Sequence, residues 1–159
     1  MFRTIRKKKN EISLDAVKEL LHCSRRGILA VNGDDGYPYA VPVNYLYDED
    51  TQKIFFHGAK AGYKVDALKA CDKVCFTVCG NETIKDEAWA PYVKSAVVFG
   101  RCHLMENKEN AMAALKKFAM KYYPLSSDYA QCEKEWTWVL SPMPWENEAN
   151  QICICKGGR

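Results

Sequence analysis

The sequence predicts an α+β protein built on an antiparallel split β-barrel, with about six strands in Greek-key-like order and peripheral helices. Three observations predict this class: short apolar runs joined by tight turns, a long alternating segment over residues 93–105, and only a few helical patterns. A parallel doubly wound sheet needs a helix after nearly every strand, and the two early turns exclude it.

The size of the chain indicates one domain over residues 1–159, because 48% hydrophobic residues suffice for one substantial core. Five of the first nine residues are basic, which defines a basic N-terminal arm over residues 1–12. The rest of the chain carries 18 basic and 20 acidic residues. We therefore expect an arm that is disordered or packs on a partner, and no nucleic-acid partner, with an arm-based nucleic-acid contact as the alternative.

The start of the chain differs from a secretory signal, because the polar residues Asn10 and Glu11 follow the basic ones where a signal needs an apolar region. No apolar run reaches the roughly 18 residues of a membrane span. We expect a cytoplasmic protein without membrane contact, in which the eight cysteines are reduced thiols. Their spacing does not match a structural zinc site, and no metal is expected.

The expected elements follow from apolar periodicity and from capping and turn residues. In chain order they are a helix over 13–23, strands over 27–31, 39–47 and 53–58, a helix over 61–70, strands over 74–79 and 93–105, a helix from Asn107 to Pro124, and a strand over 152–155.

The most informative segment is residues 55–64, where a strand passes through two glycines into a helix. A helix N-terminus presents unpaired N–H groups, Gly58 and Gly62 let the backbone approach a ligand, and Lys60 or Lys64 adds full charge. This pattern is typical of an anion-binding corner, with an ordinary strand-to-helix turn as the alternative. It is not a P-loop, because the order of residues differs.

Pro42 interrupts an apolar strand, and proline cannot donate to a β-ladder. We therefore expect this strand at a sheet edge or at a bulge. A bulge beside the anion corner would turn N–H and C=O groups toward a planar heterocycle, and Asn44 can add a side-chain amide. A barrel-edge proline with no ligand is the alternative.

These residues lie in blocks that resemble the FMN-binding split-barrel superfamily of pyridoxamine 5'-phosphate oxidases, most closely its nitroimidazole-resistance branch of Nim-type nitroreductases. The blocks are residues 33–43, 56–59 with Gly62 and Lys64, and 95–100, and with the basic arm they cover most of residues 1–125. The HGAxxGxK segment over 57–64 is the most specific of them. The segment after Tyr123 matches no motif of the family.

The resemblance implies a homodimer with two FMN molecules at the subunit interface. It implies ring contacts through backbone groups of Pro42, Val43, Asn44 and Tyr45, and ribityl-chain contacts from His57, Gly58, Ala59 and Lys60. It further implies that Lys64 pairs with the phosphate and that Ser95, Ala96 and Val97 lie near the flavin, from the same chain or its partner.

The implied function is an FMN-dependent oxidoreductase that reduces a small electron-poor acceptor, a nitroaromatic or a quinone, with electrons from NADH or NADPH. No dinucleotide fingerprint is present, so we expect a nicotinamide nucleotide to bind transiently over the flavin. His57 is the candidate catalytic residue, with a structural role at the strand end as the alternative. The alternative functions are a non-catalytic flavin-binding protein and a split barrel that uses haem or a deazaflavin.

Overall fold

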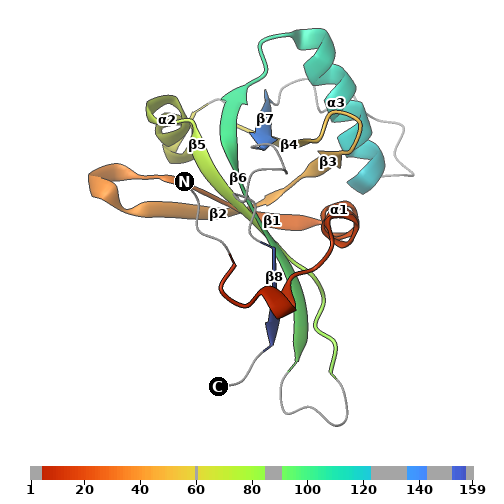
Figure 1. The fold of residues 1–159 in the computed structure, drawn as a ribbon. Coiled ribbons are helices and arrows are strands. Elements are labelled where there is room, and N and C mark those ends of the chain that lie inside the picture. Colours follow the sequence, from red (N-terminus) through yellow and green to blue (C-terminus); the bar gives the residue numbers. More distant parts are fainter. Residues whose placement is uncertain (1–4, 60, 85–90, 123–135, 143–151, 157–159) are drawn as a thin grey trace.

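The computed structural model describes residues 5–59, 61–84, 91–122, 136–142 and 152–156, which form an eight-stranded antiparallel sheet with three α-helices around it (Figure 1). The strands are β1 (Arg26–Asn32), β2 (Pro38–Asn44), β3 (Leu46–Asp48), β4 (Lys53–Gly58), β5 (Lys73–Cys79), β6 (Tyr92–Leu104), β7 (Trp136–Pro142) and β8 (Ile152–Lys156). The helices are α1 (Leu14–Cys23), α2 (Tyr63–Ala70) and α3 (Lys108–Tyr122), with short 3-10 turns η1 (Lys8–Asn10) and η2 (Asp34–Gly36).

The barrel closes through one bent strand. The sheet order β2-β1-β5-β6-β7-β4-β3 begins and ends with strands that are consecutive in the chain, separated only by Tyr45. Before the bend this strand pairs with β1, and after it with β4. The predicted antiparallel barrel is therefore confirmed. The strand count was too low, because the expected strand 39–47 divides at Tyr45 and because β7 lies in a segment that the sequence left unassigned.

The length of β6 follows from its partners. Its central part pairs with β5, while on its other side the first half pairs with β8 and the second half with β7 (Figure 1). Ala96, Val98 and Cys102 face the interior and are buried, whereas Val97 and Phe99 on the opposite face are half-buried. This confirms the two faces that the alternating sequence predicts.

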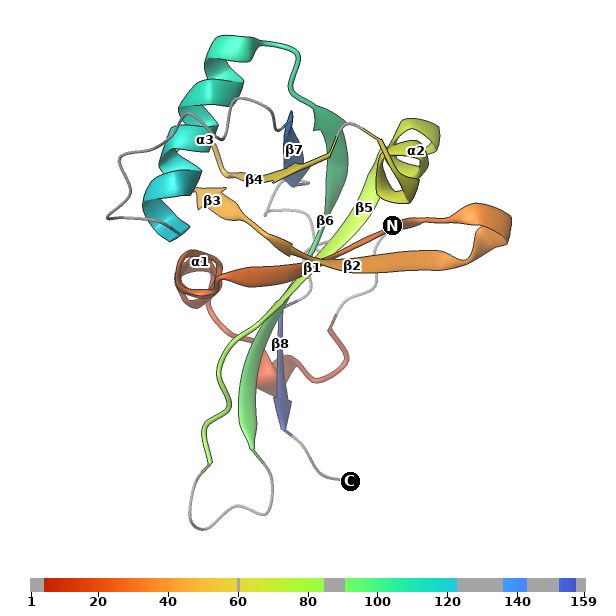
Figure 2. The ribbon, with the colours of Figure 1, turned by 180° about the vertical axis from the view of Figure 1, so that it is seen from behind.

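The helices cover different parts of the barrel. In α1 the Ser13 hydroxyl accepts the Ala16 N–H at 3.3 Å, and in α3 the Asn107 side-chain oxygen accepts the Asn110 N–H at 3.0 Å. These are the caps that the sequence predicts for both helices. Figure 2 shows α2 and α3 on opposite sides of the barrel, with α1 at the end of the barrel below α3.

One glycine inside the barrel is required by close packing. A Cβ atom on Gly27 of β1 would lie 2.2 Å from the Cζ atom of Phe76, whose ring is fully buried. The Phe76 ring therefore lies directly on the backbone of β1. Together with the buried Leu29, Ile54 and Val98 it fills the barrel interior.

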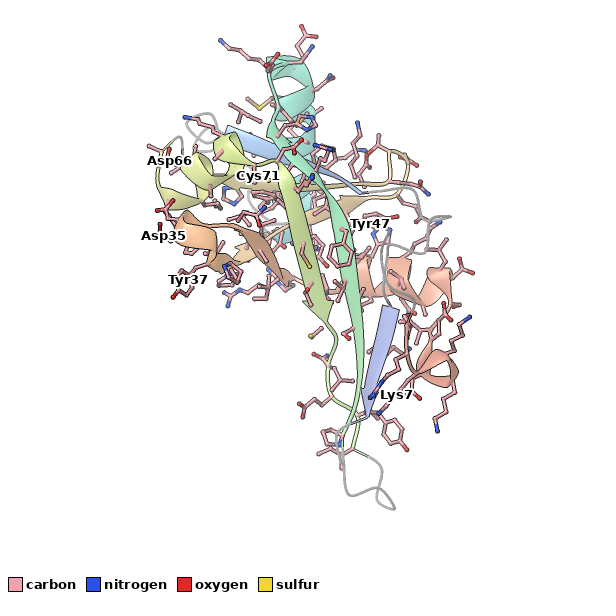
Figure 3. The ribbon with its side chains drawn as sticks, turned by 60° about the vertical axis from the view of Figure 1, so that its left-hand side comes forward. Lys7, Asp35, Tyr37, Tyr47, Asp66 and Cys71 are labelled. Carbon is pink, nitrogen blue, oxygen red and sulfur yellow. The ribbon has the colours of Figure 1, made fainter. Side chains whose placement is uncertain are left out.

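The basic arm packs on its own chain from residue 5 onward. The turn η1 contacts β8, and Figure 3 shows Lys7 beside that strand. Ile12 is buried in the core, while the side chains of Lys7, Lys8 and Lys9 are exposed. This differs from the expected arm that is disordered or docks on a partner. Among the helices of the described segments, none is both long and apolar enough to cross a membrane.

Candidate functional site

The corner between β4 and α2 holds a lysine over a glycine. The Nζ atom of Lys64 lies 3.1 Å from the position that a Cβ atom on Gly58 would take, and 5.6 Å from the centroid of the Phe56 ring. The missing side chain at Gly58 thus makes room for the ammonium group. Gly62, with φ of +123°, allows the chain to enter α2 in a conformation that other residues rarely adopt.

The charge of Lys64 has no protein counter-ion in the described part of the chain. Its ammonium is half-buried, desolvation lowers the pKa of Lys64, and no described carboxylate forms an ion pair with it. At the start of α2 the Val65 N–H donates to the Gly62 carbonyl at 2.8 Å, so the helix geometry leaves the N–H groups of Tyr63 and Lys64 for a ligand. Asp66, the acid in the first turn, is exposed. These residues fit the dianionic phosphate of a nucleotide, which would supply the missing negative charge.

A tyrosine fixes this corner against the β1–β2 turn. The Tyr63 hydroxyl accepts the Asp34 N–H at 2.6 Å, and the Tyr63 ring makes an edge contact with Tyr39 at 4.5 Å between centroids. Figure 3 shows the turn residues Asp35 and Tyr37 on the same side of the molecule as Asp66 of α2. No local sequence signal predicts this contact, because residues 34 and 63 meet only in the folded barrel.

Pro42 lies on an edge strand with no bulge. The register of β2 against β1 is unbroken from Arg26 opposite Asn44 to Asn32 opposite Pro38, and among the described strands β2 pairs with β1 alone. The expected edge is therefore confirmed, and the expected bulge is wrong. Proline is tolerated at position 42 because a backbone N–H there would point away from β1 and would form no hydrogen bond with that strand.

The phase of the ladder follows from the turn. The Gly33 N–H donates to the Tyr37 carbonyl at 2.8 Å, so hydrogen-bonded positions recur at every second residue of β2 from there. Pro38 and Pro42 fall on the alternate positions, whose backbone groups point away from β1. The same holds for Ala40 and Asn44, so the open edge presents their N–H and C=O groups to a ligand. This edge suits the donors and acceptors of a planar heterocycle.

Two residues expected near the ring point elsewhere. The backbone groups of Val43 point toward Gly27 of β1, because Val43 falls on a hydrogen-bonded position of the ladder, and Tyr45 is fully buried. The Tyr45 N–H donates to the Tyr122 hydroxyl at 2.9 Å, and its carbonyl lies 2.8 Å from the same hydroxyl. The backbone of Tyr45 therefore forms the barrel bend, in contrast to the expectation that it lines a ligand.

The structure separates His57 from Lys64. Side chains alternate along β4, and Phe56 faces the barrel interior, so His57 faces α3, where its ring makes an edge contact with Phe118 at 4.6 Å between centroids. Lys64 lies on the face of Phe56. The two side chains expected to serve one ligand thus lie on opposite faces of β4. Ala59 is exposed, and Lys60 lies outside the described residues.

Ser95, Ala96 and Val97 lie on β6, which is separated from β2 by β1 and β5. Three strand spacings correspond to roughly 14 Å. The Ala96 side chain is buried in the interior. Ser95 and Val97 lie on the outer face of the sheet, where Ser95 is also buried and Val97 is half-buried. Within one chain these residues and the β2 edge do not flank the same small group.

The outer face of this part of the sheet carries no charge over two cross-strand rows, which we call the outer apolar face. One row is Pro42, Ile28, Thr77 and Val97, and the other is Ala40, Ala30, Cys75 and Phe99. The Ile28 side chain is 43% exposed. Apolar patches of this kind mark contact sites between proteins.

A family profile described as pyridoxamine 5'-phosphate oxidase matches residues 13–141. Curated protein sequences yield no match. Among solved structures, a candidate 5-nitroimidazole antibiotic resistance protein from Bacteroides thetaiotaomicron superposes with a TM-score of 0.74 at 18% identity, over 89% of this chain and 83% of that chain.

Two further solved structures share the fold. An FAD-binding protein from Mesorhizobium loti has a TM-score of 0.59 at 21% identity, over 84% of this chain and 91% of that one. The haem storage protein HutZ from Vibrio cholerae has a TM-score of 0.63 at 14% identity, over 91% of this chain and 94% of that one. These likenesses show the fold, and the bound groups belong to those proteins.

Proposed function

Because this chain belongs to the pyridoxamine 5'-phosphate oxidase family, we propose that it is an FMN-dependent oxidoreductase that reduces a small electron-poor acceptor, a nitroaromatic or a quinone, with NADH or NADPH. The observation that carries the proposal is the half-buried Lys64 ammonium over Gly58 at the start of α2. A phosphate there gains a charge-assisted hydrogen bond and the helix N-terminus together.

In this proposal the β2 edge holds the ring of FMN. The N–H and C=O groups of Ala40 and Asn44 and the C=O group of Pro42 point away from β1, and Tyr63 holds the phosphate corner beside the same strand. When bound, FMN takes up a hydride equivalent from a donor and passes two electrons to an acceptor. A nitro group that accepts two electrons and two protons becomes a nitroso group and releases water.

The proposal includes a homodimer. Ser95 and Val97 lie roughly 14 Å from the β2 edge of their own chain. A flavin on the β2 edge that also contacts Ser95 and Val97 would therefore contact these two residues in a partner subunit. The outer apolar face supports this arrangement, because it offers uncharged surface around Ile28 and Val97 for a second copy. A two-fold axis would place each β6 across from the other chain's β2.

Haem is the second candidate, supported by the shared fold with the haem storage protein. The corner around Lys64 favours a flavin, since it offers a cation and helix amides for a phosphate. A haem protein instead needs an axial ligand. The ring of His57 packs against Phe118 and His22 pairs with Glu49 at 3.1 Å, which leaves the exposed His103 on β6 as the histidine for that role.

The absorption spectrum of the purified protein separates these possibilities. We expect a flavin spectrum, followed in anaerobic stopped-flow by bleaching with NADH or NADPH and recovery of colour on adding a nitroaromatic or quinone. A flavin spectrum that neither nucleotide bleaches indicates the non-catalytic flavin-binding protein. A Soret band indicates haem, and a spectrum with neither signature contradicts the proposal.

A further inference from the structure

A second site lies at the far end of β2 from the phosphate corner. It is an open cavity of about 1070 Å³ between the end of α1, the start of β1, the end of β5 with the residues directly after it, and the start of β6. This is at the upper end of the size range of small-molecule sites. Asn44, the last residue of β2, lines the cavity, so the β2 edge joins the two sites.

The cavity wall is positively charged. Arg25, Arg26 and Lys94 line it, and Glu19 is the one carboxylate among its lining residues. Throughout the described segments, none of these three cations forms an ion pair with a carboxylate. The Arg25 guanidinium lies over the Tyr122 ring, with 5.0 Å between its Cζ atom and the ring centroid. An anion entering the cavity would therefore meet three cations and one carboxylate, which is a net positive charge.

The rest of the wall mixes polar residues, among them Ser24, Asn44 and Thr83, with apolar and aromatic ones. Leu20, Val93 and the rings of Tyr92 and Tyr122 line it beside the cations. Such a wall gains little from a bare inorganic ion, because burial of apolar surface contributes only when the ligand has an apolar body. The combination selects an organic anion, with its apolar body on the rings and its charge on the arginines.

The cavity is preformed by backbone contacts. Thr83 and Tyr92 exchange two hydrogen bonds of 2.9 Å, and the Gly80 N–H donates to the Lys94 carbonyl at 2.8 Å. A Cβ atom on Gly80 would lie 2.9 Å from the Cδ1 atom of Leu20, so α1 packs closely on the end of β5. The wall therefore needs little ordering when a ligand binds.

We propose that this cavity binds an organic anion, a flat apolar body bearing a carboxylate or phosphate, and that this anion is a substrate of the flavin. The claim that the anion is a substrate of the flavin rests on the proposed function, because Asn44 joins the cavity to the β2 edge on which the flavin ring would lie. A carboxylated acceptor and a phosphate-bearing nicotinamide donor share this chemistry, and the experiments below distinguish them.

Cysteine labelling tests occupancy without flavin turnover. Cys23 and Cys79 are exposed and line the cavity, whereas Cys71 lies outside it. We expect 4-nitrobenzoate or NADH to slow iodoacetamide labelling of Cys23 and Cys79 but not of Cys71, as read by mass spectrometry. Protection should disappear in the Arg26→Gln/Lys94→Gln double variant and persist in Lys73→Gln, an exposed lysine at the other end of β5. Equal labelling with and without both ligands overturns the proposal.

Matched charged and neutral substrates then identify the anion. If the donor occupies the cavity, the double variant lowers kcat/KM roughly tenfold for NADH but leaves the uncharged 1-benzyl-1,4-dihydronicotinamide unchanged. If the acceptor occupies the cavity, the double variant lowers kcat/KM for 4-nitrobenzoate and leaves kcat/KM for its methyl ester unchanged. Protection without any turnover supports the cavity and contradicts the proposed function. Turnover without protection, or equal losses for charged and neutral substrates, contradicts the cavity alone.

Discussion

The hydroxyl of Tyr122, at the end of α3, accepts a hydrogen bond of 2.9 Å from the backbone N–H of Tyr45. The same hydroxyl lies 2.8 Å from the Tyr45 carbonyl and bonds to the carbonyl of Arg25, so its single proton serves two acceptors. Tyr45 is the residue at which β2 bends into β3 and leaves the ladder. A side chain from the end of α3 thus replaces the strand partner at the bend that closes the barrel.

Removing this hydroxyl should destabilise the fold. In Tyr122→Phe the buried N–H of Tyr45 loses its partner, and we expect the free energy of unfolding to fall by about 1–3 kcal/mol in urea titrations. Tyr47→Phe is the matched control, because the Tyr47 hydroxyl is buried with no hydrogen-bond partner among the described residues. This control should be neutral or slightly stabilising. A loss of equal size in both variants would contradict the role of the Tyr122 hydroxyl.

Replacing the corner lysine should weaken FMN binding. The proposed contact between Lys64 and the phosphate is charge-assisted, and its loss in Lys64→Ala should cost about 1.5–3 kcal/mol, or roughly 10- to 150-fold in affinity. Fluorescence titration with FMN measures the change. Lys69→Ala, an exposed lysine on the last turn of the same helix, is the control and should bind as the unaltered protein does. Unchanged affinity in Lys64→Ala would refute the phosphate corner.

A charge on the outer apolar face should dissociate the proposed dimer. Ile28→Glu places a carboxylate among the eight uncharged residues, and burying an unpaired charge at an interface costs several kcal/mol. We expect sedimentation velocity to show monomers and FMN retention to fall together. Leu14→Glu, an exposed apolar residue at the start of α1, is the control. A variant at Ile28 that still sediments as a dimer would place the interface elsewhere.

The half-buried position of Lys121 should make the free energy of unfolding depend on pH in the alkaline range. The pKa of Lys121 is lowered from 10.5 to about 8, mainly by burial, while Cys23 acts in the opposite direction and Arg25 in the same direction as burial. Its ammonium donates to the Ser24 carbonyl at 2.8 Å and lies 4.4 Å from the centroid of the Tyr45 ring. Between about pH 8 and 10.5 the unfolded chain binds more protons at this group, so its contribution to the unfolding free energy rises with pH.

Other groups also change the unfolding free energy at alkaline pH. The contribution of Lys121 is therefore isolated by comparing the unaltered protein with the Lys121→Gln variant at each pH. Burial raises the pKa of Cys102 to about 12, which makes stability fall above its usual value of 9.0. We expect the unfolding free energy of the unaltered protein minus that of Lys121→Gln to rise from pH 8 to pH 10 in urea titrations. Lys116→Gln, a substitution of an exposed lysine on the same helix, is titrated in parallel as the control. A flat difference for Lys121 would show that its pKa is unshifted.

The sequence by itself determined most of the elements and their order, but not β7 or the division between β2 and β3. Ser13 and Asn107 cap the helices that follow them, and apolar alternation along residues 93–105 separates the buried from the outward face of β6, because these signals act over a few neighbouring residues. The same local reasoning marked the glycines and lysine of the β4–α2 corner and the edge position of Pro42.

Only the tertiary structure decided which of those residues meet. The bend at Tyr45 depends on Tyr122, 77 positions later, and the cavity joins Arg25, Asn44 and Lys94 from three strands or their ends. His57 and Lys64 are seven positions apart in the sequence. The alternation of side chains along β4 directs His57 toward α3, whereas the packing of α2 places Lys64 over Gly58 on the other face. Contacts of this kind depend on strand register and helix packing, which local periodicity does not encode.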